Sequence, residues 1–119
     1  MDDPTTAFPI INCYPGKSVT AVFDMRAFLR SGVLVDTVTG ITEVTSSDLT
    51  WSDEAKNGSN VTLEDGTVLS AGQAIVAKVA VASSASTGKK YSLIDWTTDD
   101  TPSSSPPARV IVNVLSKTG

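Results

Sequence analysis

The chain contains no histidine, and Cys13 is the only cysteine among its 119 residues. Without histidine there can be no Ser-His-Asp or Cys-His triad, no proton relay through an imidazole and none of the common zinc sites. A single cysteine cannot form a disulfide within the chain, so the fold does not depend on an oxidising compartment. We therefore expect no enzyme: no catalytic residues, no bound metal and no cofactor.

Positive charge is also scarce. The chain has 9 Lys and Arg against 13 Asp and Glu, a net charge of -4, and Lys89-Lys90 is the only adjacent basic pair. Nucleic acids and anionic membranes attract basic surfaces, so we expect neither as a partner. No apolar run approaches the roughly 20 residues that span a bilayer. Residues 1–4 are acidic and polar where a secretory signal is basic and then apolar, which predicts a protein without an export signal.

The chain is rich in Val, Thr and Ser, which form short alternating runs typical of strands with one buried face. The runs lie at 18–24, 33–38, 41–45, 49–52, 61–64, 67–70, 74–82, 91–97 and 109–115. Short runs of this kind, separated by turn residues at about ten-residue intervals, predict an all-β sandwich of seven or eight short strands. Segment 24–32 does not alternate and ends at Gly32, which predicts one or two helical turns.

The alternation also predicts which side chains form the core. We expect Phe23, Val79, Leu93 and Val112 to point into one space between two sheets. Asp65-Gly66 separates two short runs and predicts a two-residue hairpin turn with positive φ at both positions. The domain is expected to span residues 18–119.

Residues 1–17 differ from the rest, because three prolines block a helix and favour an extended path. The segment is nonetheless too apolar for a free tail, and burying one large apolar side chain is worth roughly 1.5–3 kcal/mol. We predict an extended N-terminal arm that packs against another subunit while 18–119 folds without it. Its partner-binding residues would be Phe8, Ile10, Ile11 and Tyr14. The alternatives are an arm that packs on its own domain, or a loose terminus.

Four further features suggest a ligand or a modification only weakly. Asp99-Asp100 and the acidic residues at 52–54 lack the spacing of a calcium loop, which supplies six to eight oxygens, so solvated loops are expected. Segment 98–108, rich in Ser and Pro, predicts a projecting tip. A sugar-stacking platform could be formed by Trp51, Trp96, Phe23, Phe28 and Tyr91, but most of these large aromatic residues are expected in the core of a sandwich of this size. Asn57-Gly58-Ser59 matches a glycosylation triplet, which we interpret as loop chemistry.

The segment Thr87-Gly88-Lys89-Lys90-Tyr91-Ser92-Leu93, followed by a strand, a loop and Arg109–Val114, looks like the last hairpin of an immunoglobulin-like domain. Tyr91 and Leu93 stand in the relation of a tyrosine corner, with Leu93 where antibody domains have cysteine. Together with segment 23–32, this part of the chain resembles small Ig-like structural proteins of tailed bacteriophages. The resemblance covers roughly residues 16–115; Met25 stands where those proteins often have tryptophan, and the last loop is longer.

The resemblance implies an immunoglobulin-like β-sandwich in a virion, made in the host cytoplasm. It implies a capsid decoration or cement protein that binds the outer shell through its arm and sandwich, or a head-fibre or tail-associated component. The implied partners are the major capsid protein, other virion subunits or a copy of the chain itself. The alternative class is a tail- or fibre-associated adhesin or carbohydrate-binding module, whose glycan binding would depend on Trp51 or Trp96.

Overall fold

The computed structural model of the chain describes residues 8–106 and 108–116. Its strands are β1 (Ile11–Cys13), β2 (Ser18–Asp24), β3 (Val35–Glu43), β4 (Leu49–Lys56), β5 (Val61–Thr62), β6 (Val68–Leu69), β7 (Ala74–Val81), β8 (Gly88–Thr98) and β9 (Arg109–Val114). A 3-10 turn, η2 (Arg26–Phe28), is the one helical element in these ranges. The predicted all-β fold is confirmed, and η2 lies inside the segment predicted to form a helical turn.

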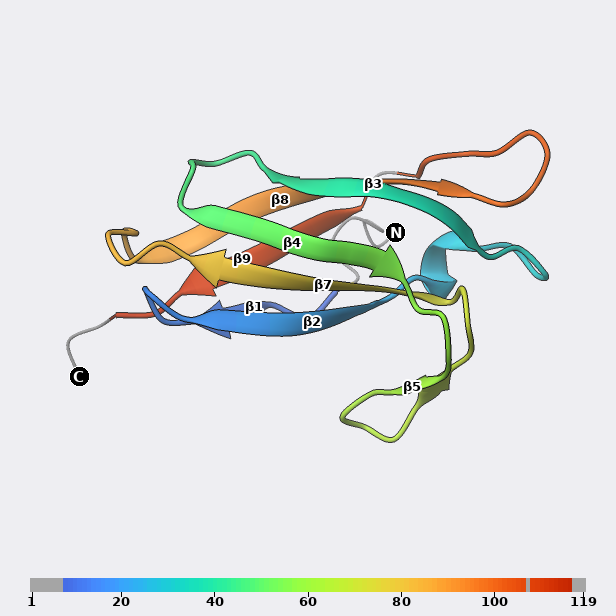
Figure 1. Ribbon diagram of the computed structural model, residues 1–119, viewed down its shortest axis with the longest axis horizontal. Helices are drawn as coiled ribbons and strands as arrows, with labels where there is room; N and C mark the ends of the chain where they lie inside the picture. The colour runs from blue at the N-terminus through green and yellow to red at the C-terminus, as the bar shows by residue number, and fades with distance from the viewer. Residues whose placement is uncertain (1–7, 107, 117–119) are drawn as a thin grey trace.

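Two sheets pack face to face as a β-sandwich (Figure 1). One sheet has the strand order β1-β9-β8-β3 and the other has the order β2-β7-β4. β1 runs parallel to β9, and the other pairs are antiparallel. β5 and β6 form a separate small hairpin that projects from one end of the sandwich.

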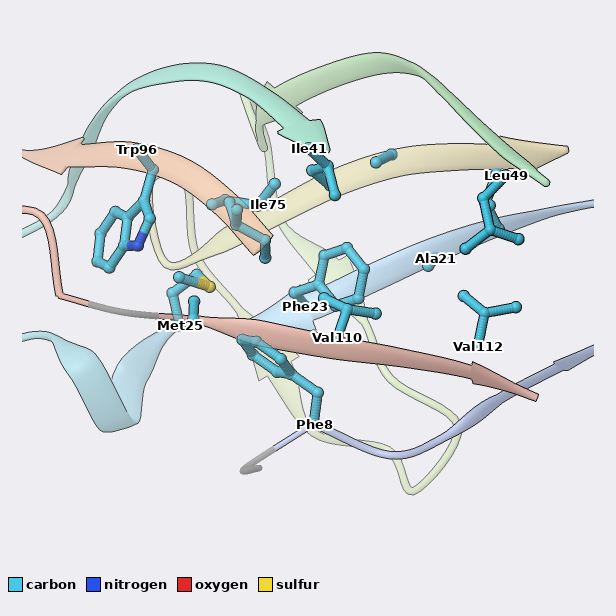
Figure 2. Packing of buried hydrophobic residues seen from close by; sticks show 14 of the residues in the cluster. Phe8, Ala21, Phe23, Met25, Ile41, Leu49, Ile75, Trp96, Val110 and Val112 are labelled. Atoms are coloured by element: carbon cyan, nitrogen blue, oxygen red, sulfur yellow. The ribbon is translucent and has the colours of Figure 1, made fainter. Parts of the chain in front are cut away.

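The core lies between the sheets and receives side chains from both (Figure 2). Phe23, Ile75 and Val79 enter from the three-stranded sheet, and Trp96 and Val112 enter from the four-stranded sheet. In β2, β7 and β9 the buried residues alternate as the sequence predicts. Phe23, Val79 and Val112 are confirmed as core residues.

Leu93, the fourth predicted core residue, lies on the outer face of the sheet and is 47% exposed. Residues with even numbers in β8 point inward instead, although Lys90, Ser92 and Thr98 among them are polar. The predicted register of this strand was therefore wrong by one residue, which moves every side chain to the other face.

The polar side chains on the inner face of β8 can be buried because they form hydrogen bonds or ion pairs with other residues of the chain. The Lys90 ammonium lies 3.3 Å from a carboxylate oxygen of Asp48 and donates to the Ser86 hydroxyl at 2.8 Å. The Ser92 hydroxyl accepts a hydrogen bond from the Trp51 indole at 3.0 Å. A buried polar group that is hydrogen-bonded carries little penalty, so the strand tolerates this register.

The tyrosine-corner correspondence also fails. Tyr91 faces outward beside Leu93, and its ring lies against the Arg109 guanidinium, whose central carbon is 5.1 Å from the ring centroid. The position that antibody domains fill with an inward cysteine is here an outward leucine.

Several element boundaries also differ from those predicted. The runs at 33–38 and 41–45 form one strand, β3, with two register irregularities. β4 continues to Lys56, so residues 52–54, which were expected in a solvated loop, belong to a strand. In the β5–β6 hairpin, Gly66 has a positive φ of 90°, whereas Asp65 does not. The Gly66 N–H donates to the Leu63 carbonyl at 3.0 Å, so the turn is longer than the predicted two residues.

The N-terminal segment belongs to the sandwich from Phe8 onward. Ile11–Cys13 pairs with Val112–Val114 of β9, and Cys13 is buried, which raises the pKa of its thiol. Phe8 is 8% exposed, and its ring centroid lies 5.1 Å from that of Phe23 and 5.6 Å from that of Phe28. The boundary predicted at residue 17 therefore does not separate an arm from the domain, because the strand bonds and Phe8 are satisfied within one chain. Residues 1–7 lie outside the described residues.

Candidate functional site

The four residues predicted to bind a partner have different surroundings. Phe8 lies in the core, so it is not available to a partner of the folded domain. Ile11 is half-buried against the same core. Ile10 and Tyr14 are 43% and 52% exposed and are the two that present apolar area to solvent. That they bind a partner stays a prediction.

A groove of about 530 Å³ lies beside Ile10 and Ile11. Its lining comes from three parts of the chain: Pro9–Asn12, Val19–Asp24 of β2, and Thr62–Asp65 of the β5–β6 hairpin. The N-terminal segment and β2 belong to different sheets, so the groove opens on the side of the sandwich where β1 and β2 are the edge strands. Sequence reasoning identified the apolar N-terminal residues but not the other two walls.

The backbone edge of β2 faces this groove. Within the described chain, β2 pairs only with β7. The Val81 N–H donates to the Lys17 carbonyl, and the Met25 N–H donates to the Gln73 carbonyl, both at 2.9 Å. In an antiparallel pair every second residue bonds to the neighbour, so the odd-numbered residues of β2 bond to β7. The even-numbered residues, Thr20 and Val22 at the centre, direct their N–H and C=O groups to the open edge.

Asn57 holds the segment that forms the hairpin wall of the groove. The side chain is 5% exposed, and its carbonyl oxygen accepts hydrogen bonds from the N–H groups of Gly72 (2.9 Å) and Ala74 (3.0 Å). Its amide nitrogen donates to the carbonyls of Ser70 at 2.9 Å and Ser59 at 3.0 Å. This use of Asn57 leaves no free amide for glycosylation. Nothing in the sequence distinguishes such an anchor from an ordinary loop asparagine.

The end of the groove at Asp24 is acidic. Asp24 forms an ion pair with Arg26 at 2.7 Å, and the hydrogen bond from this guanidinium lowers the pKa of Asp24. The Asp65 carboxylate accepts a hydrogen bond from the Thr67 backbone N–H at 2.9 Å. This bond lowers the pKa of Asp65, and Arg26 makes a smaller contribution in the same direction. Glu64 is exposed beside it. Three carboxylates and one guanidinium therefore surround this end.

A second exposed region lies on the outer face of the four-stranded sheet. Tyr91 and Leu93 of β8 lie opposite Ile111 and Arg109 of β9, respectively. We call Tyr91, Leu93 and Ile111 the apolar sheet face. The outer face of an antiparallel sheet is normally polar, so this apolar group is unusual. Arg109 packs on Tyr91, and its buried Nε has no hydrogen-bond acceptor among the described residues.

The acidic tip and the tryptophans are engaged within the domain. Asp99 accepts a hydrogen bond from the Leu34 N–H at 2.9 Å, and Asp100 contacts Arg30 and Thr98. In the ranges that the structure describes, no group of three or more His, Cys, Asp or Glu side chains could hold a metal ion.

Trp96 is fully buried and donates to the Pro106 carbonyl at 3.0 Å, while Trp51 is half-buried. Among the five aromatic residues considered for a sugar platform, Phe23 is also buried and Phe28 is half-buried, whereas Tyr91 is 37% exposed. The five rings therefore do not form one exposed platform. No helix in the described ranges is long and apolar enough to span a membrane.

Comparison with known proteins identifies no family for this chain. No protein-family model matches it, and no curated protein matches it significantly.

Proposed function

We propose that this chain is a non-enzymatic structural protein of a virion, a capsid decoration or cement protein that docks on the outer shell through its apolar sheet face. The observation that carries the proposal is the outward placement of the exposed Tyr91 and Leu93 and the half-buried Ile111 beside Arg109. Apolar surface that is exposed in the isolated chain and grouped on one face is typical of a docking site.

Arg109 adds specificity to this face. Its guanidinium is held against the Tyr91 ring as a positive charge on this face, and a guanidinium pairs well with a carboxylate. A shell subunit that presents an apolar patch next to an Asp or Glu would match both the apolar side chains of this face and the charge of Arg109. Weak docking of each copy is sufficient when many copies bind a repeating surface.

The strand order supports an immunoglobulin-like identity. In such domains the strands B, E and D share one sheet and the strands C, F and G share the other. Here β2-β7-β4 and β3-β8-β9 have the same order when the strands are matched along the chain. This correspondence supports an immunoglobulin-like sandwich independently of the tyrosine corner, which is not formed among the described residues.

The proposal predicts that a major capsid gene lies near the gene for this chain, and it is tested with shells assembled from that capsid protein. Leu93→Asp removes apolar area and places a carboxylate opposite Arg109, without changing the core. Thr50→Asp is the matched control, because Thr50 is exposed on the outer face of the other sheet. Co-sedimentation should show at least about tenfold weaker binding for Leu93→Asp and unchanged binding for Thr50→Asp.

Equal binding of both variants would exclude the apolar sheet face as the contact. A wild-type chain that binds tail or fibre proteins instead of shells would place it in that part of the virion. Binding to none of the virion proteins would reject the structural role.

A further inference from the structure

Three of the four edge strands are protected against pairing with another chain. On the side of β3 and β4, the Glu54 carboxylate accepts the Ile41 N–H at 3.0 Å and the Glu43 carboxylate accepts the Leu49 N–H at 2.8 Å. Asp53, with a φ of 56°, lies where the register of β4 shifts. β1 has three residues and lies between two prolines. Short strands, irregularities, prolines and charged groups are the usual means of blocking a sheet edge.

β2 has none of these protections. It is seven residues long, contains no proline and pairs with β7 without a register shift from Ser18 to Asp24. Its inward side chains, Val19, Ala21 and Phe23, are all apolar. The N–H and C=O groups of Thr20 and Val22 have no strand partner among the described residues and face an open groove. A straight, regular and unpaired edge is a template for another strand.

We propose that β2 pairs antiparallel with β2 of a second copy, so that two three-stranded sheets become one six-stranded sheet. A two-fold axis near Ala21 places Thr20 of each copy opposite Val22 of the other, and both residues have backbone groups that face the open edge. Such an interface is isologous and closes at the dimer. The inference rests on the β2 edge alone and does not require the virion role.

The charges at the two ends of β2 favour this partner and this direction. Lys17 precedes the strand, and Asp24 ends it beside Glu64 and Asp65. Antiparallel pairing about Ala21 brings Lys17 of each copy to the acidic end of the other. Parallel pairing would instead place the two acidic ends together, where like charges repel.

The first test uses proline at the centre of the edge. Thr20→Pro removes an N–H that faces the groove and no hydrogen bond to β7, whereas Thr20→Val keeps the N–H and is the matched control. Sedimentation equilibrium should show a dimer for the wild type and Thr20→Val, and at least about tenfold weaker association for Thr20→Pro. Circular dichroism checks that the proline variant is folded.

A second test does not depend on the proline variant. Lys17→Glu should weaken the dimer, and adding Glu64→Lys should restore it, because both side chains are exposed and the two charges are exchanged. A wild-type chain that stays monomeric up to about 1 mM overturns the proposal. A dimer that is weakened neither by Thr20→Pro nor by Lys17→Glu also overturns the proposal. A monomeric chain that binds another virion protein, and loses that binding in Thr20→Pro, overturns it as well. Shell binding is measured separately with Leu93→Asp, so failure here is distinct from failure of the virion role.

Discussion

The two long sides of the sandwich differ in how their edge strands are protected against pairing with another chain. On the β3–β4 side, a short connection brings two edge strands of different sheets together, and Glu43 and Glu54 cap amides across the gap. On the β1–β2 side, the edge strands are also close in sequence, but no side chain in ranges 8–106 and 108–116 caps the edge of β2, and a groove remains. The comparison indicates that one side is closed by its own chain and the other is available to a second chain.

The largest expected effect concerns Phe8, which packs in the core just before the groove-lining residues Pro9–Asn12. Phe8→Ala should lower the free energy of unfolding by about 3–5 kcal/mol, because the ring fills the space between Phe23 and Phe28. Ile10→Ala is the control on the exposed side of the same segment and should cost less than about 1 kcal/mol. Urea denaturation measures both. Equal small effects would mean that the segment is a separable arm after all, as the sequence predicted.

Asn57→Ala should have the next largest effect, since it removes the anchor of the hairpin wall. Loss of the carboxamide leaves buried N–H and C=O groups of residues 70–74 without their partner, which we expect to cost about 2–3 kcal/mol. Asn60→Ala, at an exposed asparagine of the same loop, is the control. Thermal unfolding gives the ranking. An unchanged melting temperature for Asn57→Ala would show that the hairpin is held by other contacts.

On the closed side, Glu54→Ala should cost about 1–2 kcal/mol, because it leaves the Ile41 N–H without its acceptor. Glu54→Gln retains an acceptor oxygen and should recover part of that loss. Chemical denaturation of the two variants compares them directly. If both match the wild type, the carboxylate cap contributes nothing and the difference between the two sides is smaller than the structure indicates.

The smallest effect is the pH dependence at the acidic end of β2. The folded pKa of Asp24 is lowered by Arg26, so this carboxylate contributes stability above its unfolded pKa, and that stability is lost as pH falls through the folded value. The loss is therefore expected below about pH 4. Because the pair is partly exposed, it should amount to less than about 1 kcal/mol. Asp24→Asn should have a flatter acid profile than the wild type; an identical profile would show that the ion pair adds no stability.

The sequence predicts those strands whose inner face is uniformly apolar. β7 and β9 alternate Ile and Val with smaller or polar residues, so Val79 and Val112 are assigned correctly. β8 is misassigned because its inward residues include Lys90 and Ser92 while Leu93 points outward. The partners that make this arrangement stable, Asp48 and Trp51, are about 40 residues away in the chain and are not visible as a local pattern.

The candidate site is predictable only in part. The apolar N-terminal segment is evident from Phe8 and Ile10, but periodicity cannot show whether such residues cover their own core or a neighbour. An edge strand and a central strand also have the same alternation, so nothing in residues 18–24 indicates that one side of β2 is unpaired. The groove requires three distant segments to meet, which only the tertiary structure shows.

The most direct test of the difference between the two sides is amide hydrogen exchange, followed by NMR at low and high protein concentration. At low concentration the amides of Ile41 and Leu49 should be protected by their carboxylate caps, whereas those of Thr20 and Val22 should exchange rapidly. At high concentration, Thr20 and Val22 should become protected while Ile41 and Leu49 do not change. Rapid exchange of Thr20 and Val22 at every concentration, or protection already in the monomer, would contradict an open β2 edge that pairs with a second copy.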